Sequence, residues 1–263
     1  MKKWAARALV LALALTVVFA FTACGGSNGG EDKDKTYVAA MEPTFPPFDT
    51  TNKDGDLDGF DVDLVNAIAK DQGIKVEWKN MEFDGLISAL DSGNIDIVCS
   101  GLSITKEREK KVAFSQPYYK AGLALSVAKS NNTIKSVDDL NTKTIVGAQI
   151  GTSGAKQADK LKKEGKISEV KTYNGLDVAF KDLENGTIDA VINDQPVTKT
   201  YVDKSPDKLK IVGKRMNAEN YGIAVKKDND ELLKTMNNGL KNIEKDGTLK
   251  KLYKKWKLGT PDL

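Results

Sequence analysis

Arg108 stands among small polar residues in a pattern suited to holding an anion. Ser100, Gly101 and Ser103 precede it closely, and arginine is rare in a chain that is rich in lysine. A guanidinium group grips a carboxylate through two parallel hydrogen bonds, which an ammonium group cannot do. The segment therefore indicates recognition of an anion. The alternative is that Arg108 is an ordinary surface cation within the charged run 106–111.

The sequence contains no histidine, which excludes several kinds of catalytic and metal site. A Ser-His-Asp or Cys-His catalytic unit cannot be built, and zinc sites lose a usual ligand. The sequence has two cysteines, and the first, Cys24, follows the N-terminal apolar run. Cys99 is therefore the one cysteine in the folded body, and we expect no disulfide there. Cys99 ends an apolar strand predicted at 95–99, which favours a buried free thiol. We expect no enzyme activity, no metal and no cofactor.

The N-terminus is typical of an exported protein. Basic residues precede an uncharged run over 8–21, which is shorter than the roughly 20 residues of a membrane span. The following Phe-Thr-Ala-Cys24 resembles the lipobox of bacterial lipoproteins, in which cleavage leaves a lipid-bearing cysteine. This resemblance implies a signal peptide at 1–23, a lipid (palmitate) on Cys24 and membrane anchoring. Residues 24–35 are polar and glycine-rich, which predicts a flexible linker.

Charge argues against a nucleic-acid partner. Removal of 1–23 takes away three basic residues and no acidic ones, so 40 basic residues become 37, against 37 acidic residues. Nucleic-acid binding calls for a clustered basic face, which a neutral chain with dispersed lysines does not predict.

Short apolar strands alternate with amphipathic helices, which predicts α/β lobes with largely parallel sheets. Asp61 is the expected cap of a helix that Gly73 ends. The other elements are predicted as strands at 37–41, 74–78, 95–99, 144–148, 188–192 and 221–225, and helices at 83–92, 153–164, 230–245 and 248–256.

An internal echo supports two similar lobes, although shared α/β patterning could produce it alone. In both places a helix ends at glycine and leads through Ile-Asp into a buried strand. The aligned positions are Leu90, Gly93, Ile95, Asp96 and Val98 with Leu183, Gly186, Ile188, Asp189 and Val191.

Five segments together resemble the polar amino-acid binding proteins of bacterial ABC importers (extracellular solute-binding family 3). They are 42–48 (EPTFPPF), 59–64 (GFDVDL), 83–87 (FDGLI), 100–119 and 188–194 (IDAVIND). The resemblance implies an α/β fold of the periplasmic-binding-protein-like type II class: two three-layer lobes joined by a two-strand hinge. Lobe 1 would be discontinuous, at 36–118 and 222–263, and lobe 2 would span 119–221 with the hinge strands at its ends.

The same resemblance assigns roles in a ligand site. Arg108, with Ser103 and the amide of Ser153 in the Gly-Thr152-Ser153 loop, would hold the ligand α-carboxylate. Asp194, with the carbonyl of Ser100 or Gly101, would accept the α-ammonium. Phe45 and Phe83 would enclose the ligand side chain, with core packing as the alternative for each ring.

Selectivity is expected from Glu42, Gln149 and Asn193, which match positions that read the tip of the side chain. A carboxylate there favours a cationic or hydrogen-bond-donating ligand: arginine first, then lysine, histidine or glutamine. The alternative is that Glu42 points to solvent.

The resemblance thus predicts a monomeric, lipid-anchored binding protein outside the cell membrane, in a bacterium with a single membrane. It would deliver an amino acid to an ABC permease with its ATPase. One alternative is a cleft enzyme similar to cyclohexadienyl dehydratase, with Glu42 or Asp194 as acid or base. A ligand-sensing receptor domain is less favoured because no membrane segment or signalling domain follows Trp256.

Overall fold

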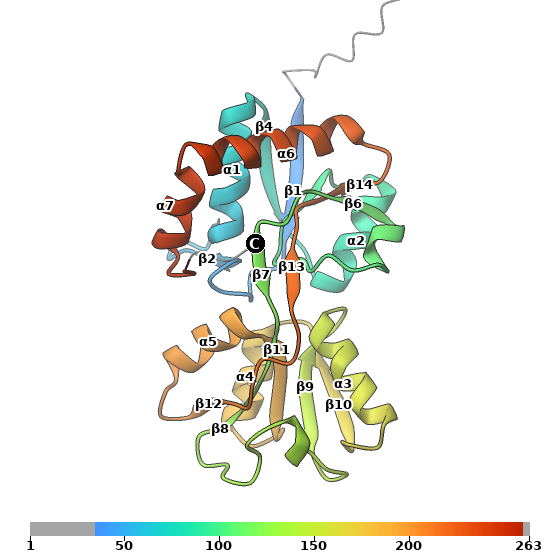
Figure 1. The fold of residues 1–263 in the computed structure, drawn as a ribbon, viewed down its shortest axis with the longest axis vertical. Helices are drawn as coiled ribbons and strands as arrows, with labels where there is room; N and C mark the ends of the chain where they lie inside the picture. The colour runs from blue at the N-terminus through green and yellow to red at the C-terminus, as the bar shows by residue number, and fades with distance from the viewer. Residues whose placement is uncertain (1–34, 260–263) are drawn as a thin grey trace, which may run out of the picture. The chain divides into compact units, whose positions relative to one another are not determined.

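The computed structural model describes residues 35–259, which form two mixed sheets with helices packed on them (Figure 1). The predicted signal peptide, Cys24 and the linker through residue 34 lie outside the described residues. Within 35–259, no helix has the length and apolar character needed to cross a bilayer.

The first sheet, with its helices, is called lobe 1. Its strand order is β4-β1-β5-β14-β6, in which β4, β1 and β5 are parallel, while β14 runs antiparallel to both β5 and β6. The strands are β1 (Thr36–Met41), β4 (Lys75–Asn80), β5 (Ile97–Val98), β6 (Val112–Phe114) and β14 (Ala224–Lys226). The helices are α1 (Phe60–Gln72), α2 (Phe83–Ser92), α6 (Asp230–Lys245) and α7 (Thr248–Lys255).

The second sheet, with its helices, is called lobe 2 and repeats this plan. Its order is β10-β9-β11-β8-β12, with β10, β9 and β11 parallel, and β8 antiparallel to β11 and β12. The strands are β8 (Leu123–Ala128), β9 (Ile145–Gln149), β10 (Glu169–Tyr173), β11 (Ala190–Asp194) and β12 (Leu209–Val212). The helices are α3 (Ser153–Lys163), α4 (Leu176–Glu184) and α5 (Gln195–Lys204).

Two short strands link the lobes. β7 (Tyr119–Ala121) and β13 (Glu219–Tyr221) pair antiparallel, with Tyr119 opposite Tyr221, and Figure 1 shows them side by side between the sheets. The two-lobe, two-strand-hinge architecture is therefore confirmed, and the residue boundaries of the lobes stay a prediction. The remaining elements are β2 (Thr50–Thr51), β3 (Leu57–Asp58) and the short 3-10 helices Arg108–Lys110 and Val137–Asp139.

The prediction that Asp61 caps α1 is wrong. Gly59 occupies the cap position with φ +138°, where an added Cβ would lie 2.0 Å from the Phe48 carbonyl oxygen. Asp61 lies inside the helix, fully buried, and its Oδ2 accepts the Gly101 amide at 2.7 Å and the Tyr118 hydroxyl at 2.9 Å. The carboxylate thus accepts hydrogen bonds from the loop after β5 and from Tyr118 instead of from the first turn of its own helix.

The predicted strand at 221–225 is two strands. β13 ends at Tyr221 and β14 begins at Ala224, because the first pairs with β7 in the hinge and the second enters the lobe 1 sheet. The other predicted strands differ by one or two residues at their ends. Among them, β5 is limited to Ile97–Val98, and β11 covers Ala190–Asp194. The second shift places Asp194 at the end of a strand.

The internal echo is confirmed in three dimensions. In lobe 1, the Val38 amide donates to Asp96 Oδ2 at 2.9 Å and the Asp96 amide donates to the Val38 carbonyl at 2.8 Å. In lobe 2, the Ile145 amide donates to Asp189 Oδ2 at 2.7 Å and the Asp189 amide to the Ile145 carbonyl at 3.0 Å. The same two-bond joint therefore ties each Ile-Asp strand to its parallel neighbour.

An aromatic cluster in lobe 1 supports the hinge. Phe48 is fully buried and meets Phe60, Tyr119 and Tyr221 edge-on, with ring centroids 5.8, 4.9 and 5.1 Å away. Edge-to-face contacts of this kind add to the stabilisation that burial alone gives. The facing hinge residues Tyr119 and Tyr221 are thereby packed into the core of lobe 1. Cys99 is buried and free, as predicted.

Candidate functional site

Arg108 joins the two lobes. Its Nη1 donates to the Ser103 carbonyl at 2.8 Å, and its Nη2 donates across to the Gly151 carbonyl of lobe 2 at 3.1 Å. The guanidinium carbon lies 5.4 Å from the centre of the Phe83 ring, a cation–π contact. The side chain is only 8% exposed, so the alternative of a solvated surface cation is wrong.

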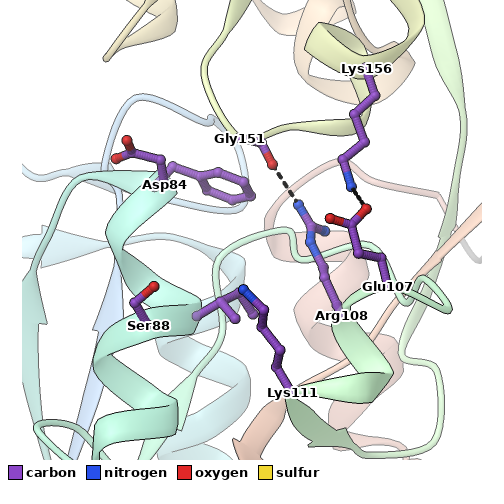
Figure 2. Close-up of a pocket in the computed structure, with 9 residues that line it drawn as sticks. Asp84, Ser88, Glu107, Arg108, Lys111, Gly151 and Lys156 are labelled. Carbon is purple, nitrogen blue, oxygen red and sulfur yellow. Dashed lines mark hydrogen bonds and ion pairs between the residues drawn. The ribbon is translucent and has the colours of Figure 1, made fainter.

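A cavity of about 190 Å³ opens beside Arg108. Figure 2 shows Arg108 and Lys111 from lobe 1 and Lys156 from lobe 2 around it. Lys156 also forms an ion pair with Glu107 across the lobes, and both side chains are largely exposed. Gly151, with φ +78°, fits here because an added Cβ would lie 3.1 Å from the Asp84 backbone. The cavity thus lies where the lobes meet and has a mixed lining, in which three cations and two carboxylates stand beside apolar groups such as Phe83.

Ser103 is held differently from the prediction. Its hydroxyl donates to the Glu219 carboxylate at 2.5 Å instead of being free for an anion. Glu219, on β13, was missed by the sequence reasoning because it lies 116 residues away and in no motif. Burial lowers the pKa of Arg108, while the charges of Asp194 and Glu219 oppose that shift. Glu219 is therefore part of the electrostatics of the site.

Asp194 ends β11 and is 4% exposed. Burial first, and then Glu219, raise the pKa of its carboxyl to about 7, against the opposing effects of Tyr221 and Arg108. Tyr221 lies near enough to favour the ionised carboxyl, but its hydroxyl and Asp194 Oδ1 make no hydrogen bond of regular geometry among the described residues. A buried orphan acceptor is costly, so a ligand that donates a hydrogen bond at Oδ1 would be favoured. An ammonium group fits this demand.

Glu42 and Gln149 meet directly across the lobes. Gln149 Nε2 donates to Glu42 Oε2 at 2.8 Å and to the Asn174 carbonyl at 2.7 Å. Glu42 is 5% exposed, so the alternative that it points to solvent is wrong, and burial raises its pKa. Gln149 Oε1 has no partner among the described residues. A carboxylate beside an orphan amide oxygen favours a ligand with several N–H donors.

The loop after β9 connects the two ends of the site. Gln149 contacts Glu42, and two residues later the Gly151 carbonyl accepts from Arg108. The Thr152 hydroxyl is committed to structure: it donates to the Gln149 carbonyl at 2.6 Å and accepts the Ala155 amide at 3.1 Å, which caps α3. Ser153 is the first residue of α3, where amide groups lack partners within the helix and suit an anion.

The remaining predicted residues line the same region or support it. The Ser100 hydroxyl accepts the Glu42 amide at 3.0 Å, and Asn193 is buried with its amide 3.4 Å from the Asp194 carbonyl. Phe45 packs against the backbone of Gly101, where a Cβ would lie 2.4 Å from its ring. Gly101 is therefore needed for that approach. The enclosure of a ligand by Phe45 and Phe83 stays a prediction.

Comparison with known proteins identifies the family. The family model of bacterial extracellular solute-binding proteins, family 3, matches residues 37–260. The chain belongs to this family. The resemblance seen in the five sequence segments is thereby confirmed.

Individual relatives in this family are similar over most of their length. The arginine-binding extracellular protein ArtP of Bacillus subtilis (strain 168) is 37% identical, with 98% of this chain and 99% of ArtP covered. A solved ancestral arginine-binding protein bound to arginine is 46% identical, with a TM-score of 0.80 over 84% of this chain and 97% of that one. The ancestral amino acid-binding protein AncCDT-1, described as a precursor of cyclohexadienyl dehydratase, is 39% identical, with a TM-score of 0.77 over 84% and 95%.

Proposed function

We propose that this chain is the extracytoplasmic substrate-binding component of an ABC importer, and that it captures a polar L-amino acid between its lobes. Arginine or another basic amino acid is favoured, and glutamine is next. The observation that carries this proposal is the pair of buried acceptors left without partners among the described residues, Asp194 Oδ1 and Gln149 Oε1, the second beside Glu42.

The chemistry of an amino acid matches these groups. Asp194 would accept the α-ammonium, and Arg108 with the amide of Ser153 would hold the α-carboxylate. Arg108 would exchange its bond to the Gly151 carbonyl for the ligand. Glu42 and Gln149 would accept the N–H groups of a guanidinium or amide tip. The arginine-binding names of ArtP and of the ancestral structure support the same preference.

Delivery and anchoring complete the proposal. A permease with its ATPase would receive the amino acid, and a lipid on Cys24 would hold the monomer at the outer face of the cell membrane.

The test is a binding measurement on the purified protein. Saturating ligand at about 100 times its dissociation constant adds roughly 2.7 kcal/mol to the free energy of unfolding, so a thermal-shift screen of the common amino acids identifies ligands. We expect arginine to give the largest shift. Glu42→Gln should then weaken arginine more than glutamine in calorimetry, because it removes a charge that only the cation needs. Equal losses would show that Glu42 does not read charge.

A second candidate function is a cleft enzyme. The pKa of Asp194, raised to about 7, suits acid–base work at neutral pH. The chain is similar to AncCDT-1, which is described as a precursor of a dehydratase, and this similarity is consistent with an enzyme on the same fold. Turnover of prephenate or arogenate by the pure protein would favour this candidate over transport.

A further inference from the structure

Thr44 provides a second link between Glu42 and lobe 2, besides the direct bond from Gln149 to Glu42. The Thr44 amide donates to Glu42 Oε1 at 3.2 Å, and the Thr44 hydroxyl donates to Glu42 Oε2 at 2.9 Å. Both oxygens of the carboxylate are therefore oriented by one neighbour. Hydrogen bonds to an ionised group are roughly twice as strong as neutral ones, so this arrangement favours the charged form of Glu42.

The same Thr44 hydroxyl also accepts a hydrogen bond from the other lobe. The donor is the amide of Leu176, the first residue of α4, at 2.8 Å. The preceding Gly175 lets the two lobes come close, because an added Cβ there would lie 3.2 Å from the Thr44 methyl group. The contact is thus a bond to a helix N-terminus that forms when the lobes meet.

A second bond fixes Thr44 from α5. The Tyr201 hydroxyl donates to the Thr44 carbonyl at 2.8 Å, and the Tyr201 ring stacks on Phe180 with centroids 4.1 Å apart. This bond also links the lobes but does not touch Glu42. It therefore provides a natural control for lobe closure alone.

One hydroxyl group serves both Glu42 and α4, and it has only one proton. When Glu42 is ionised it accepts the hydrogen bond of this hydroxyl, whose oxygen lone pairs are then left to accept from the Leu176 amide. A neutral side chain at position 42 can place its own donor on this oxygen and compete with Leu176. The charge at position 42 and the docking of α4 are therefore linked at a single atom.

We infer that Thr44 is a positioning residue that couples Glu42 to lobe closure and so strengthens the preference for a cationic over a neutral amino-acid side chain. The inference rests on the proposed function, since it assumes that Glu42 reads the ligand. Thr44 lies in the family segment 42–48, but that segment does not reveal this role, because the partners Leu176 and Tyr201 lie 132 and 157 residues away.

The experiment is calorimetry of arginine and glutamine with the full chain and three variants. Thr44→Val keeps the shape but removes the hydroxyl, and we expect arginine to weaken about tenfold and glutamine only about threefold, since the lost bond to a charged group is the stronger one. Thr44→Ser restores the hydroxyl and should return both affinities to within about twofold of the wild type. Tyr201→Phe should weaken both ligands by the same factor, about threefold.

The outcomes separate this inference from the proposed function. Equal losses for the two ligands in Thr44→Val, or no recovery in Thr44→Ser, would overturn the role of Thr44 while the wild type still binds arginine. Failure of the wild type to bind arginine would overturn the proposed function and this inference together. If Thr44→Val is too unstable to measure, the comparison of Thr44→Ser with Tyr201→Phe decides. A changed ratio of arginine affinity to glutamine affinity in Thr44→Ser contradicts the inference.

Discussion

Lobe 1 and lobe 2 share a framework but place different chemistry on it. Their sheets have the same plan, in which only the fourth strand of the order runs antiparallel to the other four, and each contains the same Ile-Asp joint. Counting four residues on from Val38 and from Ile145 reaches Glu42 and Gln149, so these two residues occupy equivalent positions. They also touch, at 2.8 Å.

A similar count from Asp96 and Asp189, the aspartates of the Ile-Asp joint, shows where the two lobes differ. Five residues after Asp96 stands Gly101, and five after Asp189 stands Asp194. In lobe 1 the position must be glycine, because Phe45 packs against it. In lobe 2 it is a buried carboxylate with a raised pKa. The frame therefore fixes where side chains meet, and a single difference on it puts a carboxylate in lobe 2 where lobe 1 has a glycine.

The largest expected effect concerns Arg108, the lobe 1 residue that is proposed to hold the α-carboxylate of the ligand. Arg108→Ala should weaken amino-acid binding by roughly 100-fold or more, because it leaves a buried carboxylate of the ligand without its partner. Calorimetry measures the loss, and circular dichroism checks that the fold is retained. Lys156→Ala is the matched control on the same cavity: its exposed ion pair should change affinity less than about twofold. Native-like binding by Arg108→Ala would defeat the assignment.

The next largest effect concerns Asp194 in lobe 2, and it is tested through the pH dependence of ligand affinity. Burial and Glu219 raise the pKa of Asp194 to about 7, above its ordinary value, so the carboxyl is protonated below that pH. An ammonium group needs the ionised form, and affinity should therefore fall about fivefold from pH 7 to 6 and about tenfold from pH 6 to 5. Calorimetry at several pH values measures this dependence. Asp194→Asn should bind weakly and show a flat profile, whereas a flat profile in the wild type would rule out this role for Asp194.

The smallest effect asks whether the shared joint is equally important in both lobes. Asp96→Ala and Asp189→Ala each remove the carboxylate that accepts a strand amide, so each should lower the free energy of unfolding by about 1 kcal/mol. Urea titration measures both. Asp159→Ala, an exposed position on α3, is the control and should change little. A large cost in one lobe and none in the other would show that the structural echo does not carry equal energy.

Much of the framework could be predicted because it is local. The helix at 83–92 and the helix at 230–245 follow from apolar spacing and agree with α2 and α6 to the residue. Gly73 ends α1 in the left-handed conformation, as its lack of a side chain allows. Arg108 was found because its type is rare and its neighbours are small. Each of these signals lies within a few residues of the feature that it predicts.

What could not be predicted depends on contacts between distant segments. Asp61 looks like a helix cap until its partners, the Gly101 amide and the Tyr118 hydroxyl, are known. Glu219 lies in none of the sequence motifs and acts on a serine 116 residues away. Thr44 lies in the segment 42–48, but its bond to a helix of the opposite lobe has no signal there. Sequence patterns reveal which residue types are unusual, but which of them meet is decided by the fold.

The position of β14 has a consequence for how the chain assembles during synthesis. All strands of the lobe 2 sheet lie between Leu123 and Val212, so that sheet is complete once this stretch has emerged. The lobe 1 sheet waits for Ala224–Lys226, because β14 is inserted between β5 and β6. Until then those two strands have open edges that invite aggregation. The half of the protein that is made first is thus finished last, and a chain stalled before residue 224 would leave the facing edges of β5 and β6 unpaired.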